Sequence, residues 1–218
     1  MKLTSLVILR ALLLLPAILL VNSLGTVETF AQDAPKPQVE RETPSVLMSE
    51  RAYRRFETLA QLYADNEYQE ALRAAQSYLD AQLSDYERAM GEQLYGYVLI
   101  ALDRMEEAIA RFERAVELDA LPNAAHFNLM RSLAQLYASR EEWQRSIDMM
   151  KEYLKFQPEP TPEDRVMMGQ NYAQLGRYRE AVQWVTDAIR QAGRDSKESW
   201  YQLALGMHFE LKDYRSAL

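Results

Sequence analysis

Tyr68-Gln69-Glu70-Ala71-Leu72 places an aromatic residue three positions before a small residue, which an aliphatic residue then follows. The pattern recurs four more times, as Met105-Glu106-Glu107-Ala108-Ile109 (methionine in the aromatic place), Trp143-Gln144-Arg145-Ser146-Ile147, Tyr178-Arg179-Glu180-Ala181-Val182 and Tyr214-Arg215-Ser216-Ala217-Leu218. The small residues of these segments are 37, 38, 35 and 36 positions apart. A period in this range is typical of stacked helical hairpins, because one hairpin is too small to bury its own apolar face. The sequence therefore predicts an all-α solenoid of antiparallel helix hairpins.

Apolar periodicity predicts about five hairpins over residues 46–218. The second, third and fourth are expected at about 86–121, 124–156 and 162–192. The fifth begins near Ser196 and reaches only the first turns of its second helix at Leu218. We therefore expect either that the natural protein continues with further repeats or that this chain is a fragment.

Individual residues predict where helices begin and end. Thr161 precedes Pro162, Glu163 and Asp164, which suits a capped helix start with carboxylates near the positive end of the helix dipole. Gly193 is predicted to end a helix in the left-handed conformation.

The N-terminus predicts export. Lys2 and Arg10 precede an apolar run from Ala11 to Val21 and then small and polar residues, which matches a secretory signal over residues 1–31. Cleavage is expected after Ala31, with Gly25 as the rival position. The alternative is an uncleaved anchor over residues 3–24, although it carries a charge inside it. Residues 32–45 contain three prolines among polar residues and are predicted to be flexible or extended.

Composition argues against several classes of function. The formal charge is -7 and both signs are interleaved along the helices, whereas a nucleic-acid partner needs clustered lysine and arginine. Without cysteine there is no disulfide, thiolate metal site or thiol nucleophile. His126 and His208 lie 82 positions apart, and the carboxylate pairs Glu106-Glu107 and Glu141-Glu142 fit helix-start charges. We therefore predict no cofactor, no metal site and no enzymatic activity.

Each predicted hairpin resembles the tetratricopeptide repeat, a unit of about 34 residues with small side chains where its two helices cross. The matching small residues are Gly96, Ala134 and Gly169 in first helices and Ala71, Ala108, Ser146, Ala181 and Ala217 in second helices. The matching bulky residues are Leu99, Tyr137, Tyr172, Phe112, Met150 and Val185. The first and fifth units depart from the pattern, with Leu59 and Leu205 at the crossing. The resemblance covers about residues 50–218 and implies a right-handed superhelical solenoid.

A narrower resemblance rests on the segments Leu83-Ser84-Asp85-Tyr86-Glu87-Arg88-Ala89, Leu133-Ala134-Gln135-Leu136-Tyr137, Lys197-Glu198-Ser199-Trp200-Tyr201-Gln202-Leu203 and Glu210-Leu211-Lys212-Asp213-Tyr214. With the signal and the long repeat spacing, they resemble a bacterial family of exported tetratricopeptide proteins encoded beside TonB, ExbB and ExbD. This resemblance implies a periplasmic protein that assists iron-carrier uptake across the outer membrane. Membrane contact is then expected only through partners or through an uncleaved anchor.

The first helices of such a solenoid line a concave face, which is the predicted site for a peptide segment of an envelope protein. Projection of the repeat places there Tyr53, Phe56, Tyr63, Gln93, Tyr97, Asn128, Arg131, Gln135, Val166, Gln170, Gln174 and Gln202. Aromatic rings supply contact area and amides bond a peptide backbone. The alternative for Tyr53, Phe56 and Tyr97 is packing between helices. The resemblance also argues against a chaperone-tail adaptor, because the asparagines that hold a C-terminal carboxylate there are replaced by Ala60, Tyr97, Gln135 and Gln170.

The predicted function is a non-enzymatic periplasmic scaffold, and on resemblance an accessory component of TonB-dependent energy transduction. Two alternatives remain open. One is a scaffold for outer-membrane or cell-wall assembly, and the other is a set of substrate-presenting repeats in an enzyme whose catalytic domain lies beyond residue 218.

Overall fold

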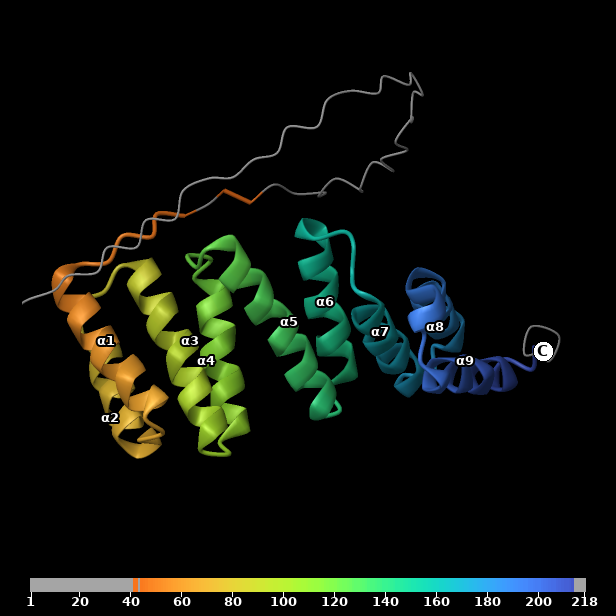
Figure 1. The fold of residues 1–218 in the computed structure, drawn as a ribbon, viewed down its shortest axis with the longest axis horizontal. Helices are drawn as coiled ribbons and strands as arrows, with labels where there is room; N and C mark the ends of the chain where they lie inside the picture. The colour runs from red at the N-terminus through yellow and green to blue at the C-terminus, as the bar shows by residue number, and fades with distance from the viewer. Residues whose placement is uncertain (1–40, 43, 214–218) are drawn as a thin grey trace, which may run out of the picture. The chain divides into compact units, whose positions relative to one another are not determined.

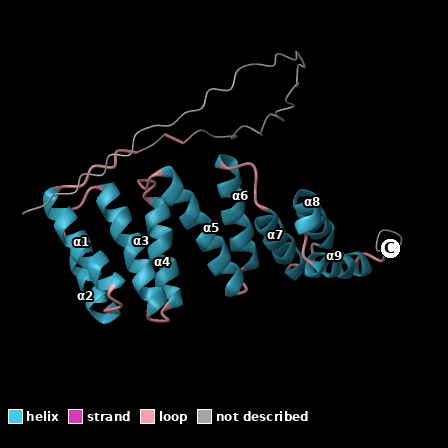
Figure 2. Ribbon diagram, viewed as in Figure 1, coloured by secondary structure: helices cyan, strands magenta, loops and turns pink. Residues whose placement is uncertain are grey.

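The computed structural model describes residues 41–42 and 44–213, and this part contains helices and loops but no strand (Figure 2). Its helices are α1 Glu50–Ala64, α2 Tyr68–Leu79, α3 Asp85–Ala101, α4 Met105–Glu117, α5 Asn123–Ser139, α6 Trp143–Phe156, α7 Pro162–Gln174, α8 Tyr178–Ala192, the short 3-10 helix η1 Gly193–Asp195 and α9 Glu198–Glu210 (Figure 1). The predicted signal at 1–31, most of the segment 32–45 and the last motif at 214–218 lie outside the described residues. Within the described part, no helix combines the length and the apolar character that a membrane span requires.

The helices pair in chain order. Residues 65–67, 102–104, 140–142 and 175–177 join α1 to α2, α3 to α4, α5 to α6 and α7 to α8, and α9 begins a fifth unit. Each helix packs mainly against the next, and α1 also contacts α3. The predicted all-α array of helix hairpins is therefore confirmed, whereas its right-handed superhelix stays a prediction.

One residue with positive φ recurs at the same place in every hairpin turn. These residues are Asn66, Asp103, Glu141, Gly176 and Lys212, with φ between 57° and 70°. The amide after each of them donates to a carbonyl five residues back, as Glu67 does to Leu62 at 2.9 Å. The turns thus repeat with the same period as the small residues. Gly193 also has a positive φ of 56°, but its ψ of -116° differs from the left-handed helical conformation that the sequence predicts.

Of the first helices, α1, α3 and α7 begin with a side-chain cap whereas α5 and α9 do not. Ser84 and Thr161 open α3 and α7 with capping boxes, in which the N3 carboxylates of Glu87 and Asp164 accept from the backbone N–H of the cap. The predicted start at Thr161 is confirmed. The second helices α2, α4, α6 and α8 have no side-chain cap, and the chain enters them directly from the turn.

The two helices of a hairpin approach closely at fully buried small residues. A Cβ atom built on Gly96 would overlap the Phe112 ring, with Cδ1 2.6 Å away. A Cβ atom on Gly169 would overlap the Val185 side chain and lie 3.0 Å from the Ala181 carbonyl oxygen. Only glycine therefore fits these two crossings without movement of a neighbour.

The third hairpin places a hydroxyl at its crossing. Ser146 is fully buried, and its Oγ donates to the Ala134 carbonyl at 2.7 Å and accepts from Asn171 Nδ2 at 2.7 Å. Because Asn171 lies on α7, this bond also ties the third hairpin to the fourth. Both polar groups thereby have the partners that buried polar atoms need.

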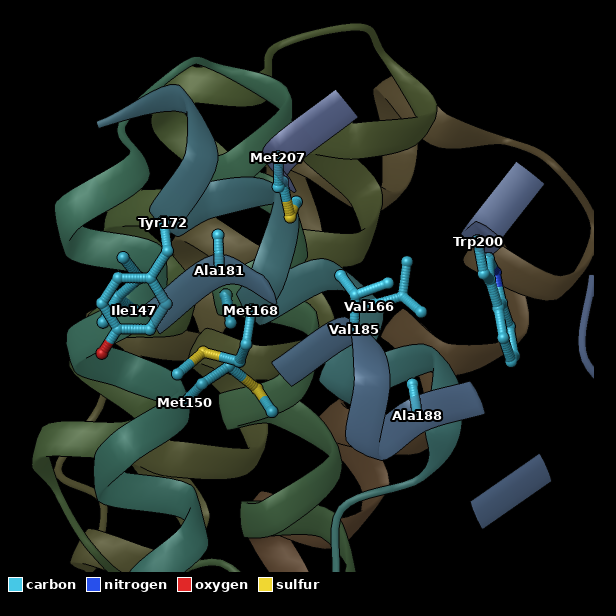
Figure 3. Close-up of a cluster of buried hydrophobic side chains, with 11 residues drawn as sticks. Ile147, Met150, Val166, Met168, Tyr172, Ala181, Val185, Ala188, Trp200 and Met207 are labelled. Atoms are coloured by element: carbon cyan, nitrogen blue, oxygen red, sulfur yellow. The ribbon is translucent and has the colours of Figure 1, made fainter. Parts of the chain in front are cut away.

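The core is continuous along the array, because its buried clusters draw on successive hairpins. One cluster joins α1 to α4, the next joins α3 to α5, and the third joins α5 to α9. Figure 3 shows side chains of the third cluster, in which Met150 lies beside Met168 and Val185 beside Val166. Met149 and Met167 are only partly buried, so one member of each methionine pair lies in the core.

Candidate functional site

The eleven residues predicted for the peptide site fall into exposed and half-buried groups. The exposed ones are Tyr53, Asn128, Gln135, Gln170, Gln174 and Gln202, and the half-buried ones are Phe56, Tyr63, Gln93, Tyr97 and Arg131. Val166, which the projection also placed on this face, is buried at 7% exposure and belongs to the core. All of them lie on the first helices α1, α3, α5, α7 and α9.

Three of these residues occupy equivalent positions. Tyr97, Gln135 and Gln170 each follow directly after the small residue at a crossing, which is Gly96, Ala134 or Gly169. Because side chains on neighbouring helix positions point in different directions, the small residue faces the second helix while its successor lies beside the crossing. The repeat therefore gives one ring and two amides the same place on successive first helices.

The aromatic members of the set pack partly against their own hairpins. Phe56 lies edge-on to Tyr78 with ring centroids 5.9 Å apart, and Tyr97 lies edge-on to Phe112 at 5.1 Å. Both rings remain half-exposed, so packing between helices accounts for one side of each ring and leaves the other open. Tyr53 is 54% exposed and makes no such ring contact among the described residues.

Two other residues predicted for the site, Gln93 and Tyr63, lie near the hydroxyl of Tyr97. Burial raises the pKa of Tyr97 above its ordinary value, the hydrogen bond with the Gln93 side chain lowers it, and nearby Tyr63 raises it again. The structure thus brings Tyr63, Gln93 and Tyr97 together across α1 and α3. On α1 and α3, the predicted site therefore combines aromatic rings with a single amide.

The other end of the set consists of amides. Gln135, Gln170 and Gln174 are exposed, and their side chains make no hydrogen bond with any other residue in the described part of the chain. Gln202 donates to Glu198 at 3.2 Å within α9. A free side-chain amide offers two donors and an acceptor, which is what the backbone of an extended peptide requires.

Arg131 differs from the other predicted residues because it already has a partner. Its Nη2 and Nε lie 2.9 and 3.1 Å from Oδ1 of Asp164, a carboxylate that is 2% exposed. That carboxylate also closes the capping box at Thr161. Arg131 therefore links α5 to α7, and sequence reasoning missed this role because Asp164 lies 33 positions away.

Another contact that the sequence did not predict fixes the segment ahead of α1. Arg41 donates from Nε to Asp119 Oδ1 at 2.7 Å, from Nη2 to the Asp119 carbonyl at 2.7 Å, and from Nη1 to Asn123 at 2.5 Å. Its side chain is only 5% exposed. The described residues of the predicted flexible segment have no regular secondary structure, as expected, but Arg41 is anchored between α4 and α5. No sequence pattern connects residues 78 positions apart.

His126 and the paired carboxylates lie among residues that hold them in structural contacts. His126 is 4% exposed on α5, and burial, followed by the charge of Arg41, lowers its pKa below 6.5 although Asp119 acts in the opposite direction. Glu106 and Glu107 are held in ion pairs by Arg140 and Arg104. Among the described residues, no three His, Cys, Asp or Glu side chains gather in a way that could hold a metal ion.

Comparison with known proteins matches two of the hairpins to a repeat family. Residues 93–120 and 165–194 match the family model described as tetratricopeptide repeat, and they cover most of the α3–α4 and α7–α8 hairpins. No curated protein matches the chain in sequence. The family match is to the general repeat and does not extend to a TonB-associated family, so the narrower resemblance stays a prediction.

Solved structures of other repeat proteins share the fold at low sequence identity. YrrB, titled a TPR protein with an unusual peptide-binding site, has a TM-score of 0.62 and 18% identity over 77% of this chain and 81% of its own. MamA from Desulfovibrio magneticus RS-1 has a TM-score of 0.59 and 13% identity over 78% and 91%. A putative kinesin light chain of Podosopora anserina with nearly identical TPR-like repeats has a TM-score of 0.55 and 13% identity over 77% and 90%. These likenesses concern the fold alone, an array of helix hairpins like those of tetratricopeptide repeat proteins, and the family model matches two of the hairpins.

Proposed function

We propose that this helix array, two hairpins of which match the tetratricopeptide repeat model, is a non-enzymatic scaffold that binds an extended peptide segment of a protein partner along its first helices. The observation that carries this proposal is the equivalent placement of the exposed, unpartnered amides of Gln135 and Gln170 on α5 and α7. A regular row of amides suits the regular backbone of a peptide, whichever side chains the peptide has.

Two further observations support a peptide ligand. The half-exposed rings of Phe56 and Tyr97 supply apolar contact area on the same set of helices as the amides. The structurally similar YrrB is titled a TPR protein with an unusual peptide-binding site, and this likeness supports a peptide ligand for the present array.

The finer assignment is a partner in the bacterial envelope. We propose that the chain is exported to the periplasm and that its partner is a component of the TonB, ExbB and ExbD system. The support is the sequence of residues 1–31, which has the order of a secretory signal, and the resemblance of the segments 83–89, 133–137, 197–203 and 210–214. The alternative partners are outer-membrane or cell-wall assembly proteins.

Site-specific photo-cross-linking in intact cells tests both levels of the proposal. A photoreactive amino acid replaces Gln135 or Gln170 in the full-length protein, and in matched controls it replaces Gln69 or Gln144, which are exposed on the second helices α2 and α6. We expect adducts from the first-helix positions only, with TonB, ExbB or ExbD identified by mass spectrometry. Assembly proteins in those adducts would replace the TonB assignment, and adducts from the control positions alone would move the site off the first helices.

The contribution of the amides has a separate test. We expect Gln135→Ala combined with Gln170→Ala to weaken binding of the cross-linked partner roughly tenfold, since each lost hydrogen bond is worth about 0.5–1.5 kcal/mol. Gln69→Ala combined with Gln144→Ala is the control and should leave the affinity unchanged. Arg131 is left intact because its loss would disturb the link to Asp164. Titration calorimetry with the purified partner segment measures the affinity, and equal affinities of the two double variants would contradict the proposal.

A further inference from the structure

A cavity of about 350 Å³ lies between the start of α1 and the segment that joins α2 to α3. Its walls are formed by Ser49, Arg51, Ala52, Arg55, Ala81, Gln82 and Leu83. None of the residues in the row along the first helices lines it. The cavity is therefore a separate feature of the surface, and the peptide site proposed above gives it no role.

Two guanidinium groups and no carboxylate line this cavity. Arg55 is held in place, because its Nη2 donates to the carbonyl oxygen and, at 3.0 Å, to the hydroxyl of Ser77. Arg51 is exposed and forms no hydrogen bond or ion pair with another described residue. A guanidinium has five N–H donors in a planar fork that matches a carboxylate. Both arginines thus have donors free for an anionic ligand.

The basic character continues beside the cavity. A second, shallower depression shares Arg51 and Arg55 and adds Glu50 and Arg54. These three arginines lie at helix positions i, i+3 and i+4, so they occupy one face of α1. Glu50 pairs with Arg54, which leaves the charges of Arg51 and Arg55 uncompensated there.

The other walls indicate what kind of anion fits. Ala52, Ala81 and Leu83 present apolar surface next to the guanidinium groups. The volume is at the lower end of the range of about 300–1,000 Å³ for ligand pockets, which is more than one carboxylate fills. A ligand with an anionic group and an apolar side chain next to it would therefore match both the arginines and the apolar wall.

We propose that this cavity binds an acidic segment of a protein partner, with a Glu or Asp carboxylate between Arg51 and Arg55 and a neighbouring apolar side chain against Leu83. The chain as a whole has a net charge of -7, so an acidic segment is repelled from much of its surface and attracted here. Complementary charge of this kind fixes where and in which orientation a partner docks.

Peptide binding to the full-length protein tests the proposal. The ligand is the peptide Gly-Glu-Leu-Glu-Gly with an amidated C-terminus and an uncharged fluorescent dye on its N-terminus, and its counterpart has Gln in place of both Glu residues. The protein variants are Arg51→Gln and, as a matched control with the same change of charge in the same hairpin, Arg73→Gln, whose side chain is paired with Glu70. Anisotropy measures affinity, and circular dichroism with thermal melting checks that each variant is folded.

We expect the Glu peptide to bind at least tenfold more tightly than the Gln peptide, and Arg51→Gln to lose roughly tenfold in affinity for it. Arg73→Gln should retain affinity within about twofold, and raising the salt concentration should weaken binding. Equal losses of affinity in Arg51→Gln and Arg73→Gln would mean that only the overall charge of the protein matters, and this result would overturn the proposed site. Inorganic phosphate that competes as well as the peptide would show a site for small anions instead, and no binding by the wild type would end the proposal. Because Gln135→Ala with Gln170→Ala leaves the cavity unchanged, the outcome is independent of the first-helix site.

Discussion

The crossings within hairpins and the links between successive first helices are stabilised in different ways. At the crossing of the second hairpin, Gly96 lets two helices touch at Phe112, and the contact is apolar. Between first helices, a capping carboxylate reaches the neighbouring unit. Glu87 on α3 accepts from the Ser49 N–H at the start of α1 at 2.7 Å, and Asp164 on α7 accepts from Arg131 on α5. The difference implies that the Gly96 crossing depends on packing, whereas charged groups add to the shared apolar core where these first helices join, so acid should affect these links before that crossing.

The largest expected effect comes from filling a crossing. Gly96→Ala should lower the free energy of unfolding by about 2 kcal/mol, because the new Cβ overlaps the buried Phe112 ring and overpacking costs more than the gain in helix propensity. In Gly206→Ala, the matched control on α9, a Cβ meets no described atom within 4 Å and stability should rise by about 0.5–1 kcal/mol. Urea unfolding at pH 7 and at two salt concentrations measures both. A salt-dependent loss in Gly96→Ala would break the distinction between crossings and links.

Breaking a link between first helices should cost nearly as much. Asp164→Ala removes the cap of the Thr161 N–H and the partner of Arg131, and we expect a loss of about 2 kcal/mol. Glu163→Ala, one position earlier and exposed, removes only a surface ion pair with Lys197 and should change stability by less than about 0.5 kcal/mol. Unfolding curves at pH 7 compare the two variants, and equal losses would mean that the buried link has no special role.

Acid should lower the stability of the protein in two smaller steps, one at the buried His126 and one at the Glu87 link. The pKa of His126 is lowered by burial, so the unfolded chain takes up its proton more readily and stability falls as the pH drops through 6.5. Burial acts to raise the pKa of Glu87, but hydrogen bonds from Ser84 and Ser49 outweigh it and hold the pKa below 4.5. Stability from Glu87 is therefore complete above pH 4.5 and is lost as the pH falls through its lowered pKa.

Two variants test which residue causes each of the two losses of stability in acid. His126→Leu should remove the first step and Glu87→Gln the second, each without affecting the other. Thermal melting between pH 8 and pH 3 follows both steps, and Gly96→Ala should shift the whole curve without changing its shape. A changed pH profile in Gly96→Ala would show that crossings and links are coupled.

The smallest effect concerns the turns that close the hairpins. Glu141 adopts the same positive φ as Gly176 but carries a side chain, so Glu141→Gly should stabilise the protein by up to about 1 kcal/mol. Glu142→Gly at the next position, where φ is negative, is the control and should destabilise. If Glu141→Gly also destabilised in urea unfolding, the turn would depend on that side chain instead of on its backbone.

Local patterns in the sequence predicted the hairpins, the start at Thr161 and the burial of the crossing residues in the first four hairpins, but Leu205 at the predicted fifth crossing is exposed. These features are set by residues close together in the chain, and a repeated motif shows them several times. The conformation of Glu141 and Lys212 was not predictable, because neither is a glycine and the left-handed turn is recognised only by its place in the repeat.

The site was predictable only in part, for the same reason. Projection of the repeat placed Gln135 and Gln170 on the first helices, where the structure has them exposed. It did not reveal that Arg131 is bound by Asp164 or that Arg41 reaches Asp119, because these partners lie 33 and 78 positions apart. The cavity at Arg51 and Arg55 also escaped prediction, since its walls come from both ends of the first hairpin.

The packing of each helix against its successor has a consequence for how fast the chain folds. Most contacts between helices join consecutive helices, and contacts that are local in sequence go with fast folding. Any hairpin that forms first offers a template to the next, so growth can start at several places. The bond from Arg41 to Asp119 is the exception, because it closes a loop of 78 residues and should form only after the first two hairpins are in place.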